Sequence, residues 1–206
     1  MNRLEKFSTI FLIAGFISFL VAFAFLGIWP AMMTAKDAKE LEFTEVPHDF
    51  KKYYATAEDY KKGVFEGRDI YIKEACWHCH SQYVRPVSGE SLYYGNVSTP
   101  GEYENALNRP QLFGTRRVGP DLTREAGKRS FDWQIAHLYN PKWVEPHSIM
   151  PGYTWYFDES TNPPTPKKEA IALVAYLQQL GEWLKDTKRT HYDMNEITLP
   201  PTEESI

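Results

Sequence analysis

The hydrophobic pattern begins with one long apolar run near the N-terminus. Residues 7–29 carry no charged side chain. A helix rising about 1.5 Å per residue would reach roughly 35 Å over this run, enough to cross a hydrocarbon core of about 30 Å. Trp29 ends the run as an interfacial aromatic, and Arg3 and Lys6 precede it, which favours a cytoplasmic N-terminus. We therefore predict a single-pass anchor in the inner (cytoplasmic) membrane, with the rest of the chain periplasmic.

A cleaved signal peptide is the competing interpretation of this run. Ala22 and Ala24 fit an A-x-A cleavage pattern. The apolar residues continue to Trp29, however, where a cleaved sequence should already have become polar. The run also exceeds the core of about 7–15 residues that is typical of a signal peptide. An uncleaved anchor in the lipid bilayer is therefore the favoured interpretation.

Helical periodicity returns further along the chain. Residues 57–74 place apolar side chains on one face and predict a helix. Residues 130–140 begin at Ser130, a good N-cap, and stop before Pro141, which predicts a second helix.

A third helix is expected over residues 165–180. Thr165 would cap it, Pro166 suits the first helical position, and Gly181 suits the exit. No run of residues alternates convincingly enough to predict a strand. The pattern predicts a mainly α protein, with a cytoplasmic tail and anchor over 1–30, a tether over 31–56, a globular domain over 57–186 and an extended tail over 187–206.

Composition adds one exclusion and one lead. The net charge is −4, and no basic run or stripe appears, which argues against nucleic acid as a partner. The chain has 2 cysteines, Cys76 and Cys79, and His80 follows the second. Since no other cysteine exists, neither a disulfide framework nor a second cysteine pair for a zinc ribbon is available.

The spacing C-x-x-C-H is that of c-type haem attachment. Thiols at i and i+3 lie on one side of a helical turn, where Cys76 and Cys79 can add to the two vinyl groups of one porphyrin. His80 can then supply the proximal nitrogen to the iron. We predict one covalently attached c-type haem. A thioredoxin-like redox site, or a zinc site completed by two histidines, is the less favoured alternative.

The second axial ligand is predicted to be Met150. It lies between Ile149 and Pro151 in a stretch that disfavours regular structure, so its thioether can be aimed at the iron. His137 and His147 remain alternatives, each with an ordinary surface or helix role as the simpler explanation. A His/Met pair raises the reduction potential relative to His/His and blocks the iron to oxygen, which predicts electron transfer. A haem enzyme or gas sensor with an open site is the contrasting hypothesis.

These residues resemble those of a class I cytochrome c. Residues 118–122 match the family's G-P-x-L turn. The resemblance implies that the carbonyl of Pro120 accepts the N–H of the proximal histidine and so orients it. The family's crossing of first and last helices is matched by Gly67, Tyr71, Leu173 and Tyr176.

A more specific resemblance is to the mono-haem subunit II of cbb3-type (C-family haem–copper) cytochrome c oxidases. It covers the anchor and roughly residues 60–185, and it includes a long loop insertion over 81–117 that a minimal cytochrome c lacks. The matching residues after the haem motif include Gln82-Tyr83-Val84-Arg85-Pro86, Gly114-Thr115-Arg116-Arg117, Asn140-Pro141 and Ser148-Ile149-Met150-Pro151.

This resemblance implies an electron relay. The haem would take electrons from a di-haem cytochrome c subunit or a soluble cytochrome c. It would pass them to the catalytic haem–copper subunit, which reduces oxygen to water. The chain would thus belong to an enzyme without holding the oxygen-reduction site. The alternative is another membrane-anchored cytochrome c, such as the small subunit of a nitric oxide reductase or an anchored shuttle.

The insertion also carries candidate contacts. Arg85, Arg116 and Arg117 are candidates for pairing with haem propionates, because guanidinium–carboxylate pairs are strong and often bidentate. Solvated surface arginines are the simpler explanation for each. The tyrosines are candidates either for a docking face or for plain core packing: Tyr83, Tyr93, Tyr94 and Tyr103.

Overall fold

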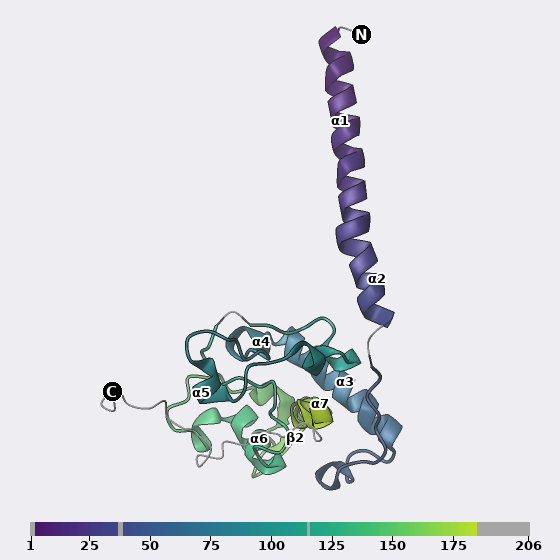
Figure 1. Cartoon of the computed structure of the whole chain (residues 1–206). Coiled ribbons are helices and arrows are strands. Elements are labelled where there is room, and N and C mark those ends of the chain that lie inside the picture. Colours follow the sequence, from purple (N-terminus) through teal and green to yellow (C-terminus); the bar gives the residue numbers. More distant parts are fainter. Residues whose placement is uncertain (1–2, 37–38, 115, 185–206) are drawn as a thin grey trace, which may run out of the picture. The chain divides into compact units, whose positions relative to one another are not determined.

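The computed structural model describes residues 3–36, 39–114 and 116–184 and is mainly helical (Figure 1). The mainly α fold class predicted from the sequence is confirmed. The chain divides into two compact units, Met1–Glu40 and Leu41–Ile206. The extended tail predicted over 187–206 lies outside the described residues.

The first unit is an apolar helix. It comprises α1 (Arg3–Ala22), a π-helical segment (Phe23–Ile28) and α2 (Trp29–Lys36). Within it, Phe7–Met33 is long and apolar enough to cross a membrane, and none of its most hydrophobic window is buried inside the structure. The helix continues past the predicted end at residue 29. Pro30 lies directly after the π-helical segment, inside this continuous helix, where its missing backbone N–H removes one helical hydrogen bond without ending the helix.

The second unit is built on α3 (Ala57–Lys73) and α7 (Lys168–Gln179), which pack against each other. Thr56 caps α3 by accepting a hydrogen bond from the backbone of Asp59. The two helices come so close that a Cβ on Gly67 would lie 1.9 Å from the carbonyl oxygen of Ala172. This crossing puts the buried rings of Tyr71 and Tyr176 5.3 Å apart at the centre of the core.

Shorter elements surround this crossing. α6 (Phe131–Tyr139) matches its predicted bounds, and Ser130 caps it by accepting from the backbone of Trp133. The remaining helices are α4 (Cys76–Cys79) and α5 (Glu90–Tyr94), with 3-10 turns at His48–Phe50, Pro100–Tyr103, Ala106–Asn108, Pro141–Trp143, Thr154–Tyr156 and Glu182–Leu184.

The predicted start of the last helix is wrong. Thr165–Pro166 forms β2, which pairs antiparallel with β1 (Phe157–Asp158), and α7 begins only at Lys168. A residue before proline favours extended backbone, which suits Thr165 to a strand. The partner strand β1 has only 2 residues, so it shows no alternation of apolar and polar residues in the sequence. The predicted exit is right in kind, since Gly181 adopts a positive φ of 81°.

The segment predicted as a tether contributes to the core. Val46, Phe50 and Tyr54 are buried, and the Phe50 ring lies 5.3 Å from that of Phe131. The compact unit accordingly begins at Leu41. Isolated aromatics between polar residues carry no periodicity, so only their tertiary contacts reveal the burial.

Candidate haem attachment site

The cysteine pair lies on a tight turn directly after α3. Ala75 takes a left-handed conformation, with φ 56°, so the chain reverses between the end of α3 and the start of α4. α4 then carries Cys76 and Cys79, whose thiols are free. Cys79 is exposed and Cys76 is half-buried. The expected placement of both cysteines on one helical turn is thus what the structure has.

The environment of Cys76 keeps its thiol protonated. Burial raises the pKa of Cys76 to about 11, although a hydrogen bond with the Tyr153 side chain opposes the shift. A redox-reactive cysteine has a lowered pKa, because the thiolate is the nucleophile. The thioredoxin-like alternative therefore finds no support at this thiol.

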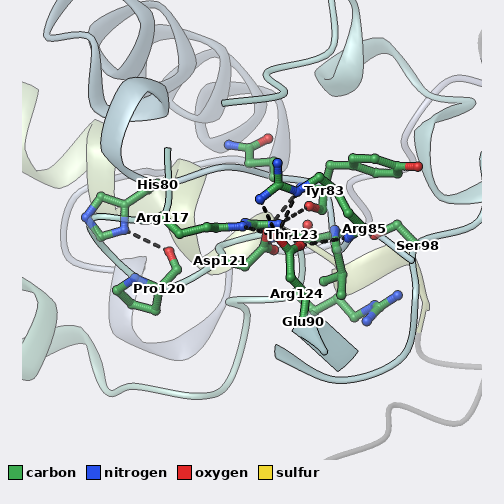
Figure 2. Close-up of polar contacts among 12 residues, drawn as sticks. His80, Tyr83, Arg85, Glu90, Ser98, Arg117, Pro120, Asp121, Thr123 and Arg124 are labelled. Atoms are coloured by element: carbon green, nitrogen blue, oxygen red, sulfur yellow. Dashed lines mark hydrogen bonds and ion pairs between the residues drawn. The ribbon is translucent and has the colours of Figure 1, made fainter. Parts of the chain in front are cut away.

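His80 is oriented through its ring nitrogen Nδ1. This atom lies 2.9 Å from the carbonyl oxygen of Pro120 (Figure 2). A carbonyl only accepts, so Nδ1 carries the proton and the lone pair lies on Nε2. Burial lowers the pKa of His80, against the effect of the Pro120 hydrogen bond, which favours the neutral imidazole that binds metals.

Gly119 allows this close approach. A Cβ at this position would lie 2.3 Å from Cε1 of His80. The Gly119 amide donates to the carbonyl of Cys79 at 3.0 Å, and the Tyr71 hydroxyl donates to the carbonyl of His80 at 2.8 Å. Backbone and ring of the histidine are therefore both held.

Met150 lies in the loop predicted for it. Its amide donates to the Ser148 hydroxyl at 3.2 Å, and its side chain packs partly buried against the core. The loop is attached to α6, since Tyr153 donates to the carbonyl of Leu138 at 2.8 Å. Ligation of iron by Met150 stays a prediction.

The two alternative histidines differ in placement. His147 is exposed. His137 is partly buried on α6, stacked on Trp133, and its Nδ1 has no hydrogen-bond partner among the described residues. Burial lowers the pKa of His137, and the electrostatic interaction with the His80 ring acts in the same direction.

The arginines of the insertion are placed differently from one another. Arg116 is exposed, whereas Arg85 and Arg117 converge on the buried carboxylate of Glu90 (Figure 2). Arg117 also pairs with Asp121 at 2.5 Å. Contact of these arginines with haem propionates stays a prediction. Sequence reasoning missed Glu90 because one glutamate in a loop carries no pattern that distinguishes it.

The tyrosines separate into core and surface. Tyr103 is buried and donates to the carbonyl of Gln82 at 2.9 Å, while Tyr93 is 72% exposed. The Tyr94 ring lies 5.0 Å from the guanidinium carbon of Arg117. Tyr103 therefore packs in the core, whereas Tyr93 lies on the surface.

The donor set fits a haem better than a bare metal ion. Across the described residues, no group of three or more His, Cys, Asp or Glu side chains is arranged to hold a metal. A haem iron needs only axial ligands from the protein, because the porphyrin supplies the other four. A free thiol pair next to a neutral imidazole with its Nε2 lone pair available meets that need.

An apolar N-terminal helix followed by a helical domain with a C-x-x-C-H turn is the arrangement typical of a membrane-anchored cytochrome c. Residues 1–167 match the family described as cytochrome c oxidase, mono-heme subunit/FixO, and the chain belongs to this family. The resemblance to the mono-haem subunit of cbb3-type oxidases is thereby confirmed. The comparison with curated proteins found no match. Membership implies a complex with a catalytic subunit, and together with the apolar helix it indicates membrane anchoring.

Proposed function

We propose that this chain is the electron-transfer subunit of a cbb3-type cytochrome c oxidase. It carries electrons through one covalent c-type haem to the catalytic haem–copper subunit, which reduces oxygen to water. The observation that carries this proposal is the His80 imidazole, held by Pro120 beside a free thiol pair, in a chain of the oxidase mono-haem family.

The attachment uses residues of one turn. Cys76 and Cys79 would hold the porphyrin by adding their S–H bonds across its two vinyl groups, with sulfur bonding to one carbon and hydrogen to the other, so that no atom is lost. His80 would hold the iron through Nε2, with Met150 as the second protein ligand. When bound, the haem supplies a one-electron couple.

The protein's own residues restrict this site to electron transfer. With His80 and Met150 both bound, an iron would have no free position for oxygen, and a His/Met pair would favour the reduced state relative to His/His. The Pro120 carbonyl fixes the plane of the His80 ring, as hydrogen bonds to metal-bound histidines generally do. A fixed ligand moves little between the two oxidation states. Oxygen reduction takes place in the other subunit.

The surface of the insertion supports docking of the catalytic subunit. Interface cores are enriched in apolar and aromatic residues, and contiguous apolar patches on a surface commonly mark interaction sites. Here the insertion and the residue after it expose Val87, Leu92, Tyr93, Val97, Phe113 and Val118. Electrons arrive from a di-haem cytochrome c subunit or a soluble cytochrome c. The anchor spans the inner membrane, with the N-terminus cytoplasmic and the haem domain periplasmic.

Purification of the full-length chain from its native membrane tests the proposal. We expect it to co-isolate with a catalytic subunit that contains haem b and copper and consumes oxygen. Isolation as a monomer, or with a b-haem subunit that lacks copper, would contradict it and would favour an anchored shuttle or a nitric oxide reductase.

A further inference from the structure

Four charged side chains meet behind the segment that orients His80 (Figure 2). Glu90 accepts from Nε of Arg85 at 2.7 Å and from Nε of Arg117 at 3.0 Å, and its second oxygen accepts from the Arg85 amide at 2.9 Å. Asp121 accepts from Arg117 at 2.5 Å. We call Arg85, Glu90, Arg117 and Asp121 the charge network.

The carboxylates of the charge network are buried and its formal charges balance, while the side chains of Arg117 and Arg85 stay 15% and 35% exposed. Glu90 is 5% exposed and Asp121 is 4% exposed. Burial alone would raise the pKa of Glu90, but hydrogen bonds from Arg117 and Arg85 hold it at about 2, so this carboxyl is ionised at neutral pH. Two guanidinium groups therefore face two carboxylates, and their formal charges cancel. A buried charge that loses its partner is strongly unfavourable, so the members depend on one another.

The network is tied directly to the histidine segment. Arg117 forms an antiparallel backbone bridge with His80. The Tyr83 amide donates to Asp121 at 3.0 Å, and Arg117 donates to the carbonyl of Tyr83. Backbone hydrogen bonds from Gly119 to Cys79 and from Leu122 to Ser81, each 3.0 Å, complete the attachment. The position of Pro120 against His80 thus depends on side chains that touch neither residue's ring.

We infer that the charge network is a positioning device for the proximal ligand and sets the electrostatic field at the haem iron. This inference rests on the haem ligation proposed above. Arg85, Glu90, Arg117 and Asp121 are positioning residues, since they act through the Cys79–Tyr83 and Arg117–Leu122 segments. Their formal neutrality means that removing one charge leaves a net charge of known sign next to the segments that hold His80.

The sign of the shift in reduction potential distinguishes a lost charge from general structural damage. Oxidised iron carries one more positive charge than reduced iron, and charges in a buried setting interact more strongly than in water. Glu90→Gln leaves a net positive network and should raise the reduction potential. Arg117→Gln leaves a net negative network and should lower it. General loosening of the site would move both variants in the same direction.

The test uses the full-length chain in detergent, with the haem absorption followed in an anaerobic redox titration. We expect opposite shifts in Glu90→Gln and Arg117→Gln and a smaller shift in the double variant. The charge-retaining Arg117→Lys and Glu90→Asp should shift the potential less than the matching neutral variants, and they replace the neutral variants in the titration if those fold poorly. Equal shifts in charge-retaining and neutral variants would overturn the inference.

A matched control breaks a second buried ion pair. Glu102 is 6% exposed and accepts from Arg124 at 2.8 Å. Glu102→Gln should lower the melting temperature without a comparable change in potential, and a shift as large as that of Glu90→Gln would count against the network. Parallel shifts with covalent haem present would overturn this inference alone. A wild-type chain without covalent haem would overturn the proposed function as well.

Discussion

The α3–α7 crossing and the layer around His80 hold their shapes by different means. The crossing is held by apolar packing, with Gly67 against Ala172 and Tyr71 against Tyr176. The His80 layer is held by backbone hydrogen bonds and buried ion pairs, and at Gly119 the backbone lies directly against the imidazole. Apolar packing contributes stability and is not directional. Hydrogen bonds and ion pairs are directional, which suits a layer whose task is to aim one imidazole.

Removing the two thiols from the turn that connects the two regions has the largest expected effect. Cys76 and Cys79 join the end of α3 to His80. Cys76→Ala with Cys79→Ala should abolish covalent haem and unfold much of the domain, because its apolar surface would lose the porphyrin as a packing partner. Haem staining on a denaturing gel measures attachment, and circular dichroism measures folding. Retained haem staining would contradict the attachment site.

Overfilling the crossing should chiefly cost stability. A Cβ at position 67 would meet the backbone carbonyl of Ala172 at 1.9 Å, so Gly67→Ala must push α3 and α7 apart. We expect destabilisation of about 3 kcal/mol, the upper part of the range for overpacked cores. Gly101→Ala is the control, since a Cβ there has nothing within 4 Å. Thermal unfolding compares them, and equal melting temperatures would refute the tight crossing.

Changing the predicted sixth ligand should alter the iron and leave both regions folded. Met150→Leu keeps a similar apolar volume but has no sulfur to bind iron. The reduction potential should fall, and the reduced protein should bind carbon monoxide. Met32→Leu, on the exposed face of α2, is the control and should change neither. An unchanged potential and spectrum in Met150→Leu would favour His137 or His147 as the ligand.

Gly119→Ala overfills the His80 layer instead of the crossing. Its Cβ would press on the imidazole at 2.3 Å, which a ring can partly avoid by rotating. We expect a modest loss of stability, smaller than for Gly67→Ala, together with a changed haem spectrum and potential. Measuring both quantities in both variants sharpens the contrast: a normal spectrum in Gly119→Ala would mean that the glycine does not set the ring position.

The smallest expected effect is a pH dependence of the stability that the His80 layer contributes. The pKa of Glu90 is lowered from 4.5 to about 2 by Arg117 and Arg85 against the effect of burial. A lowered pKa gives stability that is present above the unfolded value and lost as pH falls through the folded value. The stability difference between wild type and Glu90→Gln should therefore shrink between about pH 5 and pH 2. A difference that stays constant over this range would contradict the ion pairs.

Short-range patterns predicted much of this molecule. The anchor, α3, α6 and the haem turn follow from apolar periodicity, capping residues and the spacing of Cys76, Cys79 and His80, which all lie within a few residues of one another. The contact between His80 and Pro120 was implied only by the family resemblance, and the structure has it at 2.9 Å. The start of α7 was mispredicted because β1 competes for Thr165–Pro166.

The sequence by itself determined the long apolar helix, the mainly α class and the placement of both cysteines on one helical turn, because each depends on residues close together in the chain. Only the tertiary structure decided which partners Arg85 and Arg117 take, that Val46, Phe50 and Tyr54 enter the core, and how the His80 ring is held. Arg117 meets a carboxylate 27 positions away, and His80 meets a carbonyl 40 positions away. Such pairs form because burial leaves no water to satisfy a charge or a polar group, so the nearest complementary group in space becomes its partner.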